Sequence, residues 1–333
     1  MNSFGKIFRV TIFGESHGNG IGIVIDGCPS GLPVKFSDFT EDFNRRRSGA
    51  KGTTPRKESD IPKIVSGVFN DFTSGAPIAI TFENTNTRSR DYAALRDTPR
   101  PGHADFVATK KFGGFEDYRG GGHFSGRLTL GLVAAGVIAK KLLTPLSIEA
   151  KLIEAGGSAD IEKAVDKAIE DGDSIGGIIE CRVTNMPVGL GEPFFDSIEA
   201  VLSHMVFSIP AIKGIDFGSG FNAARMKGSE HNDKIISVDG KTSTNYAGGI
   251  NGGISNGNDL VFKVAVKPTS STHQVQKTIN IKTGNMTHLA IEGRHDTCIA
   301  LRVPVVLEAA TAIVMADFML QSHKIPGIFS QGT

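Results

Sequence analysis

Two stretches of this 333-residue chain are apolar around nearly the whole circumference of a helix. One covers residues 128–143 and is rich in glycine and alanine, and the other covers about 304–321, with Pro304 near its first turn. A helix at a protein surface keeps one polar face, so these two must have neighbours on more than one side. We therefore predict two helices buried between β layers.

Segments with the alternating pattern of β-strands account for most of the other apolar residues. They cover residues 7–13, 21–27, 64–69, 78–82, 175–183, 214–218 and 260–266. Further helices are predicted at 38–47, 158–171 and 196–207, the last on the capping-box spacing of Asp196 and Glu199. Because strands mostly follow strands, antiparallel pairs are favoured over βαβ crossovers. The predicted fold class is α+β.

Composition limits the partners of the chain. Its 36 lysines and arginines against 35 aspartates and glutamates leave no overall field that would attract nucleic acid or an anionic membrane. Its three cysteines are far apart and fit no zinc-ligand spacing, which indicates reduced thiols and neither metal nor disulfides. No apolar run has the form of a signal peptide or an uninterrupted membrane span. We expect a soluble cytoplasmic protein that binds no nucleic acid, membrane or metal.

The segment Phe13–Gly18 follows the first predicted strand and sets Glu15, Ser16 and His17 between two glycines. Glycine permits a sharp turn or the close approach of a ligand, so Ser16 and His17 are predicted to lie in a site. A plain hairpin turn is the alternative. The same residues fit the G-x-S-x-G pattern of serine hydrolases, in which a helix must follow the serine. A strand-like segment follows here, so the hydrolase is the less favoured function.

Most arginines fall between Arg45 and Arg127, in loops that contain glycine. The guanidinium fork pairs bidentately with carboxylate and phosphate, and the N-terminus of the helix near residue 128 also suits an anion. In three loops a histidine accompanies an arginine. These pairs are Arg100 with His103, Arg127 with His123, and Arg294 with His295. They predict a site for a small polyanion, with imidazoles available for proton transfer.

With these motifs in view, the chain resembles the chorismate synthase family over about residues 4–318. The marks of the resemblance are Gly14–Gly18, Asp26–Gly27, Arg45–Arg47, Arg100–Asp105, Lys267–Ser271 and Arg294–Asp296. The resemblance implies a lyase that eliminates phosphate from 5-enolpyruvylshikimate 3-phosphate to give chorismate, the last common step toward aromatic amino acids. This reaction needs reduced FMN although it has no net redox change. The two carboxylates and the phosphate of the substrate would explain the arginines.

The resemblance also implies an architecture and partners. The fold would be a layered β–α–β sandwich, two antiparallel sheets enclosing the buried helices, in a single domain over residues 1–325 with a tail at 326–333. The assembly would be a homotetramer. Since the sequence has no added flavin-reductase region, an external reductase or another source would supply the reduced flavin. A nicotinamide nucleotide (NADP) has been linked to the family's arginine at position 46.

Particular residues receive roles through the same resemblance. His17 would be the acid near the departing phosphate, His103 would keep the reduced flavin protonated, and Asp296 would assist removal of the substrate hydrogen. The residues implied to bind substrate are Ser16, Arg46, Lys51, Arg100, Arg127 and Arg294. Those implied to bind the cofactor are His123, Phe124, Ser125, Pro210, Ala211, Gly252, Lys267, Pro268, Thr269, Ser270, Ser271 and Arg294.

The sequence departs from the commoner family pattern in two of these places. It reads His123-Phe124-Ser125-Gly126-Arg127-Leu128 where many members have Arg-Ser-Ser-Ala-Arg-Glu, and Pro210 replaces a usual asparagine. The first change removes an arginine and a glutamate near the expected flavin. A second class of function, a non-catalytic flavin or polyanion binder, therefore stays open beside the enzyme.

Overall fold

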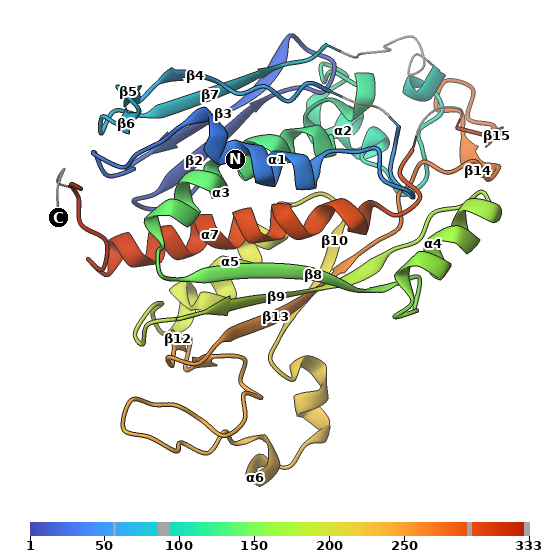
Figure 1. Cartoon of the computed structure of the whole chain (residues 1–333). Coiled ribbons are helices and arrows are strands. Elements are labelled where there is room, and N and C mark those ends of the chain that lie inside the picture. Colours follow the sequence, from blue (N-terminus) through green and yellow to red (C-terminus); the bar gives the residue numbers. More distant parts are fainter. Residues whose placement is uncertain (56–57, 86–93, 292–294, 330–333) are drawn as a thin grey trace.

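Two antiparallel sheets form the framework of the computed structural model, which describes residues 1–55, 58–85, 94–291 and 295–329 (Figure 1). The five-stranded sheet has the order β1-β2-β3-β7-β4, with strands Ser3–Phe4, Arg9–Gly14, Gly20–Asp26, Ile78–Glu83 and Lys63–Ser66. The four-stranded sheet has the order β10-β13-β9-β8, with strands Ile212–Phe217, Leu260–Val266, Gly177–Thr184 and Ser147–Ala155. Short two-stranded ribbons are β5–β6 (Val68–Phe69, Phe72–Thr73), β11–β12 (Ile250–Asn251, Ile254–Ser255) and β14–β15 (Gln276–Ile279, Met286–Leu289).

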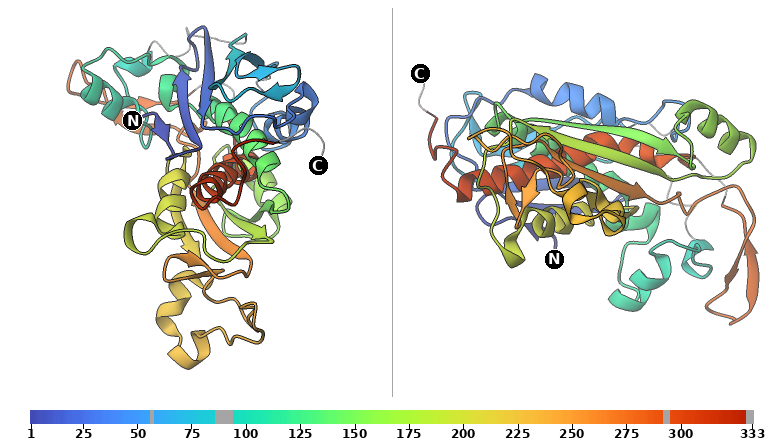
Figure 2. Two further views of the ribbon diagram at one scale, coloured as in Figure 1. Left: turned by 90° about the vertical axis from the view of Figure 1, so that its left-hand side faces the viewer. Right: turned by 90° about the horizontal axis from the view of Figure 1, so that it is seen from below.

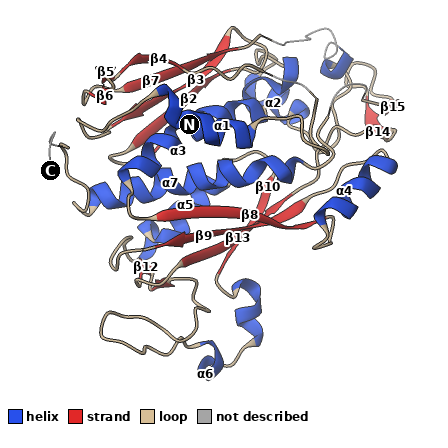
Figure 3. Cartoon of the chain, in the orientation of Figure 1, coloured by secondary structure: helices blue, strands red, loops and turns tan. Residues whose placement is uncertain are grey.

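The two apolar helices lie in the middle of the molecule, with strands on either side (Figure 2 and Figure 3). Helix α3 (Thr129–Leu142) contacts β3 and β7, whereas α7 (Val303–Gln321) contacts β8 and β9, and the two helices pack against each other. A Cβ atom on Gly136 would lie 2.5 Å from the Ala309 Cα atom, so only glycine allows this approach. The small residues of the sequence therefore serve helix packing, and the prediction of two buried helices is confirmed.

The remaining helices lie nearer the surface. They are α1 (Thr40–Arg46), α2 (Asp105–Phe112), α4 (Ile161–Glu170), α5 (Ile198–Val206) and α6 (Gly228–His231). The α+β class with antiparallel sheets is confirmed. The cap of α5 was predicted one residue too early, because the Ser197 hydroxyl, and not Asp196, accepts the Ala200 N–H bond. Helix α2 was not predicted.

The helix that is long and apolar enough to cross a membrane, Ile299–Gln321, is mostly buried within the protein. Its composition therefore reflects its place in the core. Helix α7 also fixes the start of the chain, since the Asp317 carboxylate accepts hydrogen bonds from the backbone N–H groups of Lys6, Ile7 and Phe8 at 2.7–2.9 Å. At the other end, Phe329 donates its backbone N–H to Ser30. The single domain over residues 1–325 stays a prediction.

A buried charge cluster joins α7 to its neighbours. Glu308, 2% exposed, accepts hydrogen bonds from Arg45 at 2.6 and 2.7 Å, from Lys140 at 2.9 Å and from the Ala150 backbone at 3.0 Å. Burial alone would raise the pKa of Glu308, but Arg45 and Lys140 lower it below its usual value of 4.5. The carboxylate is therefore charged at neutral pH and links α1, α3 and β8.

Replacing Glu308 by Gln should lower the free energy of unfolding at pH 7 by about 3 kcal/mol, since Arg45 and Lys140 would then share Asp42 alone. Because the folded pKa is lowered, the stabilisation is complete above the usual value of 4.5 and disappears as the pH falls through the folded value. Urea denaturation at several pH values should show the two proteins converging on acidification. The control Glu149→Gln, which breaks an exposed ion pair with Lys151, should change stability by less than about 1 kcal/mol. Equal stability of Glu308→Gln and wild type at pH 7 would contradict this account.

Candidate functional site

The loop between β2 and β3 carries Ser16 and His17, both buried. Asn84, just after β7, holds this loop by donating to the carbonyls of Glu15 and Gly18, both at 2.9 Å. The Ser16 N–H also donates to the Gly122 carbonyl at 3.1 Å. Strand β3 follows the loop directly, so the helix required by the hydrolase alternative is absent at this point, and the Ser16 hydroxyl is only 1% exposed. The nucleophile-elbow reading is thereby excluded.

Gly120 and Gly121 lie between the two predicted catalytic histidines. A Cβ atom on Gly120 would overlap the His17 ring, at 2.5 Å from Nε2, and one on Gly121 would lie 3.6 Å from His103 Nε2. Both glycines have left-handed backbone angles, with φ of 60° and 80°. The glycine run predicted as a loop therefore has His17 next to one of its residues and His103 next to the following one.

His103 belongs to a group of hydrogen-bonded charges. Its Nδ1 lies 2.6 Å from Asp105 Oδ1, and Arg100 donates to both Asp105 oxygens, at 2.7 and 2.8 Å. Arg100 also donates to the Ser271 hydroxyl at 3.1 Å. Burial alone would raise the pKa of Asp105, but Arg100 and His103 hold it well below the usual 3.8. Asp105 is therefore an anion at neutral pH.

The segment Lys267–Ser271 meets this group through Gly102. Lys267 Nζ and the Ser270 hydroxyl both donate to the Gly102 carbonyl, at 2.5 and 2.8 Å. The backbone N–H of Lys267 donates to Ala211, the residue after Pro210, at 2.9 Å. Two implied cofactor segments, 210–211 and 267–271, are thus adjacent to each other and to the loop of His103.

Arg46 and Arg127 share one buried carboxylate, that of Asp60. Arg127 is hydrogen-bonded to it and Arg46 lies 3.6 Å away, while all three side chains are at most 8% exposed. Arg127 Nε also donates to Asn84 at 3.2 Å, which joins this pair to the His17 loop. Burial lowers the pKa of Arg46 to about 9, with Arg302 adding to the fall and Asp60 opposing it. Two guanidiniums on one carboxylate leave a net positive charge that an anion would stabilise.

Asp296 belongs to the same region. Its Oδ1 accepts a hydrogen bond from the Thr54 N–H at 2.9 Å, and Arg302 lies 3.4 Å from both carboxylate oxygens. Arg302 Nε also donates to the Arg46 carbonyl at 3.1 Å. The three arginines are therefore connected, Arg46 to Arg127 through Asp60 and Arg302 to Arg46 through the Arg46 carbonyl.

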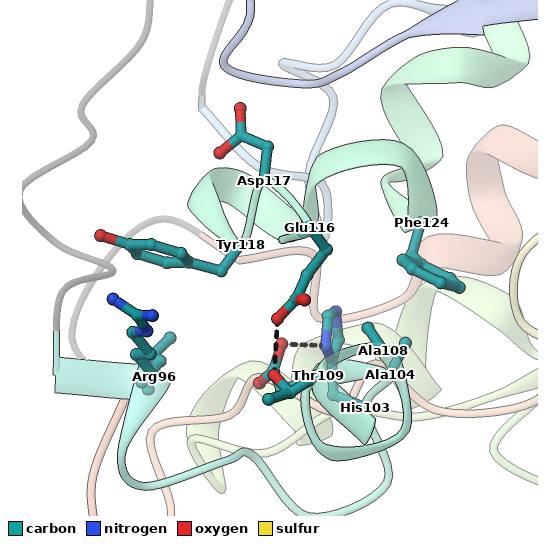
Figure 4. A pocket seen from close by; sticks show the side chains of 12 residues that line it. Arg96, His103, Ala104, Ala108, Thr109, Glu116, Asp117, Tyr118 and Phe124 are labelled. Carbon is teal, nitrogen blue, oxygen red and sulfur yellow. Dashed lines mark hydrogen bonds and ion pairs between the residues drawn. The ribbon is translucent and has the colours of Figure 1, made fainter. Parts of the chain in front are cut away.

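A pocket opens beside His103. Figure 4 shows His103 and Glu116 in its middle, with Arg96 and Tyr118 on one side and Phe124 on the other. The Arg96 guanidinium lies 5.9 Å from the centre of the Tyr118 ring. The pocket therefore offers aromatic surface next to an imidazole and a guanidinium, a combination suited to a flat, polar ligand.

Some predicted site residues lie elsewhere. Lys51 is exposed and paired with Asp166 of α4. Gly253 accepts a hydrogen bond from Ile198 at the start of α5, whereas Pro210 follows the end of this nine-residue helix, so Gly252 and Pro210 belong to opposite ends of α5. Arg294 lies outside the described residues.

The departure at His123 has a local explanation. Its Nδ1 lies 2.9 Å from the Gly14 carbonyl and its Nε2 lies 3.0 Å from the Asn2 side chain, so the ring bonds to the protein with both nitrogens. Phe124 is 40% exposed, and the Ser125 hydroxyl accepts the Arg127 N–H bond at the start of the next turn. A ligand can therefore meet the Phe124 ring more readily than the His123 imidazole.

Sequence reasoning assigned no role to four residues of this region, Asp60, Asn84, Asp105 and Arg302. Asp105 was within a recognised motif, and Asn84 began a long polar segment of the kind that is often functional. Asp60 and Arg302 gave no local signal. Asp60 takes its role from Arg127, which is more than 60 residues away, and Arg302 takes its role from the Arg46 backbone carbonyl on α1.

Fold and site together define an α+β protein with a buried, net positive arginine cluster next to two histidines and a pocket. The comparisons with known proteins agree on one family. A sequence profile described as chorismate synthase matches residues 8–320. A chorismate synthase from Chitinophaga pinensis is 64% identical over 99% of both chains, and one from Dehalococcoides mccartyi is 46% identical over 99% of this chain and 100% of the other. A crystal structure of chorismate synthase superposes with a TM-score of 0.72 at 27% identity, covering 96% of this chain and 93% of that one. The chain belongs to the chorismate synthase family, whose members are enzymes of the pathway to aromatic amino acids.

Replacing Gly120 by Ala should displace the His17 ring, because the new methyl group would overlap it. The matched control is Gly113→Ala, a glycine of similar φ whose Cβ would meet nothing closer than 3.7 Å. Both variants should lose about 1 kcal/mol of stability from the backbone strain. Only Gly120→Ala should shift the imidazole NMR signals of His17, and equal shifts in the two variants would contradict the close contact.

Proposed function

We propose that the protein is a chorismate synthase that eliminates phosphate from 5-enolpyruvylshikimate 3-phosphate in an anti-1,4 reaction to give chorismate. The substrate loses a hydrogen from C6 and a phosphate from C3, which makes the enzyme a carbon–oxygen lyase. The observation that carries the proposal is the meeting of His17 and His103 across Gly120 and Gly121, next to a buried arginine pair with excess charge. An elimination from a trianion needs such groups, since the leaving phosphate must be both held and protonated.

Each group has a part in this proposal. Arg46 and Arg127 neutralise substrate anions, and the low pKa of Arg46, about 9, means that binding an anion relieves an unfavourable buried charge. Arg100 is oriented by Asp105 and Ser271 to hold a further anionic group. His17 protonates the departing phosphate, and His103 holds or moves a proton at its Nε2. Asp296, fixed by Thr54 and Arg302, assists removal of the hydrogen.

The residues around the pocket fit reduced FMN. Two buried hydroxyls in the described part of the chain, Ser16 Oγ and Thr269 Oγ1, have no hydrogen-bond partner, as expected where a polar ligand supplies one. Phe124 and the segments 210–211 and 267–271 would hold the flavin, with Arg294 as a further partner. When bound, the reduced flavin supplies the electron density that assists loss of phosphate, with no net redox change.

The wider setting belongs to the same proposal. The enzyme is cytoplasmic, forms a homotetramer with the layered β–α–β sandwich of its family, and receives reduced flavin from an external reductase or another source. A nicotinamide nucleotide is a secondary ligand at Arg46.

The proposal is tested by an anaerobic assay with the enolpyruvyl substrate and chemically reduced FMN. We expect phosphate and chorismate to appear in equal amounts, and neither to appear when FMN is omitted or oxidised. A protein that binds reduced FMN or substrate but releases no phosphate would instead be the non-catalytic binder.

His17→Asn should lower kcat by about 10²- to 10⁴-fold, the usual contribution of a positioned acid. The change in KM should be small, because the arginines remain. His288→Asn on the exposed strand β15 is the matched control and should retain wild-type kcat. A His17 variant with full kcat would remove His17 from the mechanism while leaving the arginine site intact.

A further inference from the structure

Asp105 is the first residue of α2, and its carboxylate lies at the centre of the His103 group. Its Oδ1 lies 2.6 Å from His103 Nδ1 and accepts a bond from Arg100 NH2 at 2.8 Å. Its Oδ2 accepts bonds from Arg100 Nε at 2.7 Å and from the Arg100 backbone N–H at 3.1 Å. Asp105 is largely buried, so these contacts are its main environment, and its position cannot change without moving Arg100 or His103.

These contacts decide which nitrogen of His103 carries the proton. Arg100 NH2 also lies 3.0 Å from Nδ1, but a guanidinium only donates, so this contact would need a lone pair on Nδ1. The carboxylate contact needs the opposite, a proton on Nδ1. A lone pair facing a carboxylate oxygen at 2.6 Å would be strongly repulsive, whereas an N–H bond there is short and charge-assisted. Arg100 NH2 already has Asp105 as its acceptor, so the proton belongs on Nδ1.

With Nδ1 engaged, the other ring nitrogen is directed to the pocket. His103 lines the pocket (Figure 4), as does Gly121. A Cβ atom on Gly121 would lie 3.6 Å from Nε2. The backbone of Gly121 thus passes close to Nε2 without filling the space that a side chain would occupy. A ligand in the pocket therefore meets Nε2 and not Nδ1.

We propose that Asp105 is a positioning residue that holds His103 in the tautomer with its proton on Nδ1, so that Nε2 is the atom that gives or takes a proton at the bound ligand. Asp105 acts through His103, since Arg100 and His103 already engage both of its carboxylate oxygens. The inference refines the proposed function, in which His103 handles a proton, by naming the atom that does so and the group that fixes it.

The Asp105 carboxylate also fixes the position of the Arg100 guanidinium, so it connects proposed anion binding with proposed proton transfer. Asp105 orients the guanidinium that is proposed to bind an anion and the imidazole that is proposed to move a proton, and both partners lie within five residues of it in sequence. A purely structural role would require only that α2 begin at residue 105, which another helix-starting residue could also provide. The tautomer of His103 separates the two possibilities.

The test is an NMR measurement of the side-chain ¹⁵N and ¹H signals of histidines in the full chain, with His103→Gln used to assign the His103 signals. In the wild type, we expect the neutral His103 ring to have a proton on Nδ1 and a pyridine-type Nε2. In Asp105→Asn, Nδ1 loses its anionic acceptor and can accept from Arg100, so the Nε2-protonated tautomer should gain population. Asp105→Glu should restore part of the wild-type pattern.

A neutral His103 with its proton on Nε2 in the wild type would overturn the inference, and this result needs no variant to fold. An unchanged tautomer in a folded Asp105→Asn would also overturn it. Asp97→Asn, which removes an exposed ion pair with Lys282, is the control and should leave the His103 signals unaltered. These measurements use no substrate, so they stand or fall separately from the lyase proposal.

Kinetics give a second readout if the lyase assay succeeds. Asp105→Asn should lower kcat by about 10- to 100-fold, the usual cost of removing a residue that orients a functional imidazole. Loss of Arg100 orientation should also raise KM. The Ser271→Ala variant, which removes a different Arg100 contact, should affect KM more than kcat. The same split between kcat and KM in both variants would show that Asp105 acts through Arg100 alone and would overturn its role on His103.

Discussion

The close packing of α3 on α7 is the contact on which the rest of the structure depends. Where Gly136 faces Ala309, the two backbones are so close that no side chain fits at position 136. Each helix carries a different sheet on its outer side, so their separation sets the separation of the sheets. The loops that start or end at these helices, at Arg127 before α3 and at Arg302 before α7, are thereby brought to the same end of the molecule. The packing of α3 on α7 in the core therefore also determines where Arg127 and Arg302 lie at the site.

The buried charges of the arginine network at that end do not cancel, in contrast to those of the Glu308 cluster in the core. Arg45 and Lys140 are matched by the two carboxylates Glu308 and Asp42, and this balance stabilises the fold. Arg46, Arg127 and Arg302 face only Asp60 and Asp296 in the same network, and burial, with Arg302 adding to it, lowers the pKa of Arg46. This excess of buried positive charge supports the proposal that an anion binds here.

Sequence reasoning succeeded where the signal is local. The apolar run 128–143 predicted α3 (Thr129–Leu142) closely, because burial on every side leaves a pattern in the residues themselves. Helix α2 was missed because Phe106 and Val107 are exposed, so it has no apolar face to detect. Asp60 was missed for a different reason, since its roles come from arginines on other elements and no pattern near residue 60 records them. The site motifs were found by resemblance, but the resemblance did not say which carboxylate meets which cation.

Backbone without side chains is what allows the two histidines to share one site. At Gly122 a Cβ atom would overlap the Asp117 carbonyl, and at Gly120 it would overlap His17, so three successive glycines are needed where the chain turns back on itself. Each glycine has a positive φ, which costs other residues about 1 kcal/mol or more. Glycine also brings a peptide group, with its N–H and C=O, as close to a ligand as any group can come. The segment near His17 and His103 is thus narrow because it has no side chains, and it presents polar peptide groups. Both properties suit the proposed anion site.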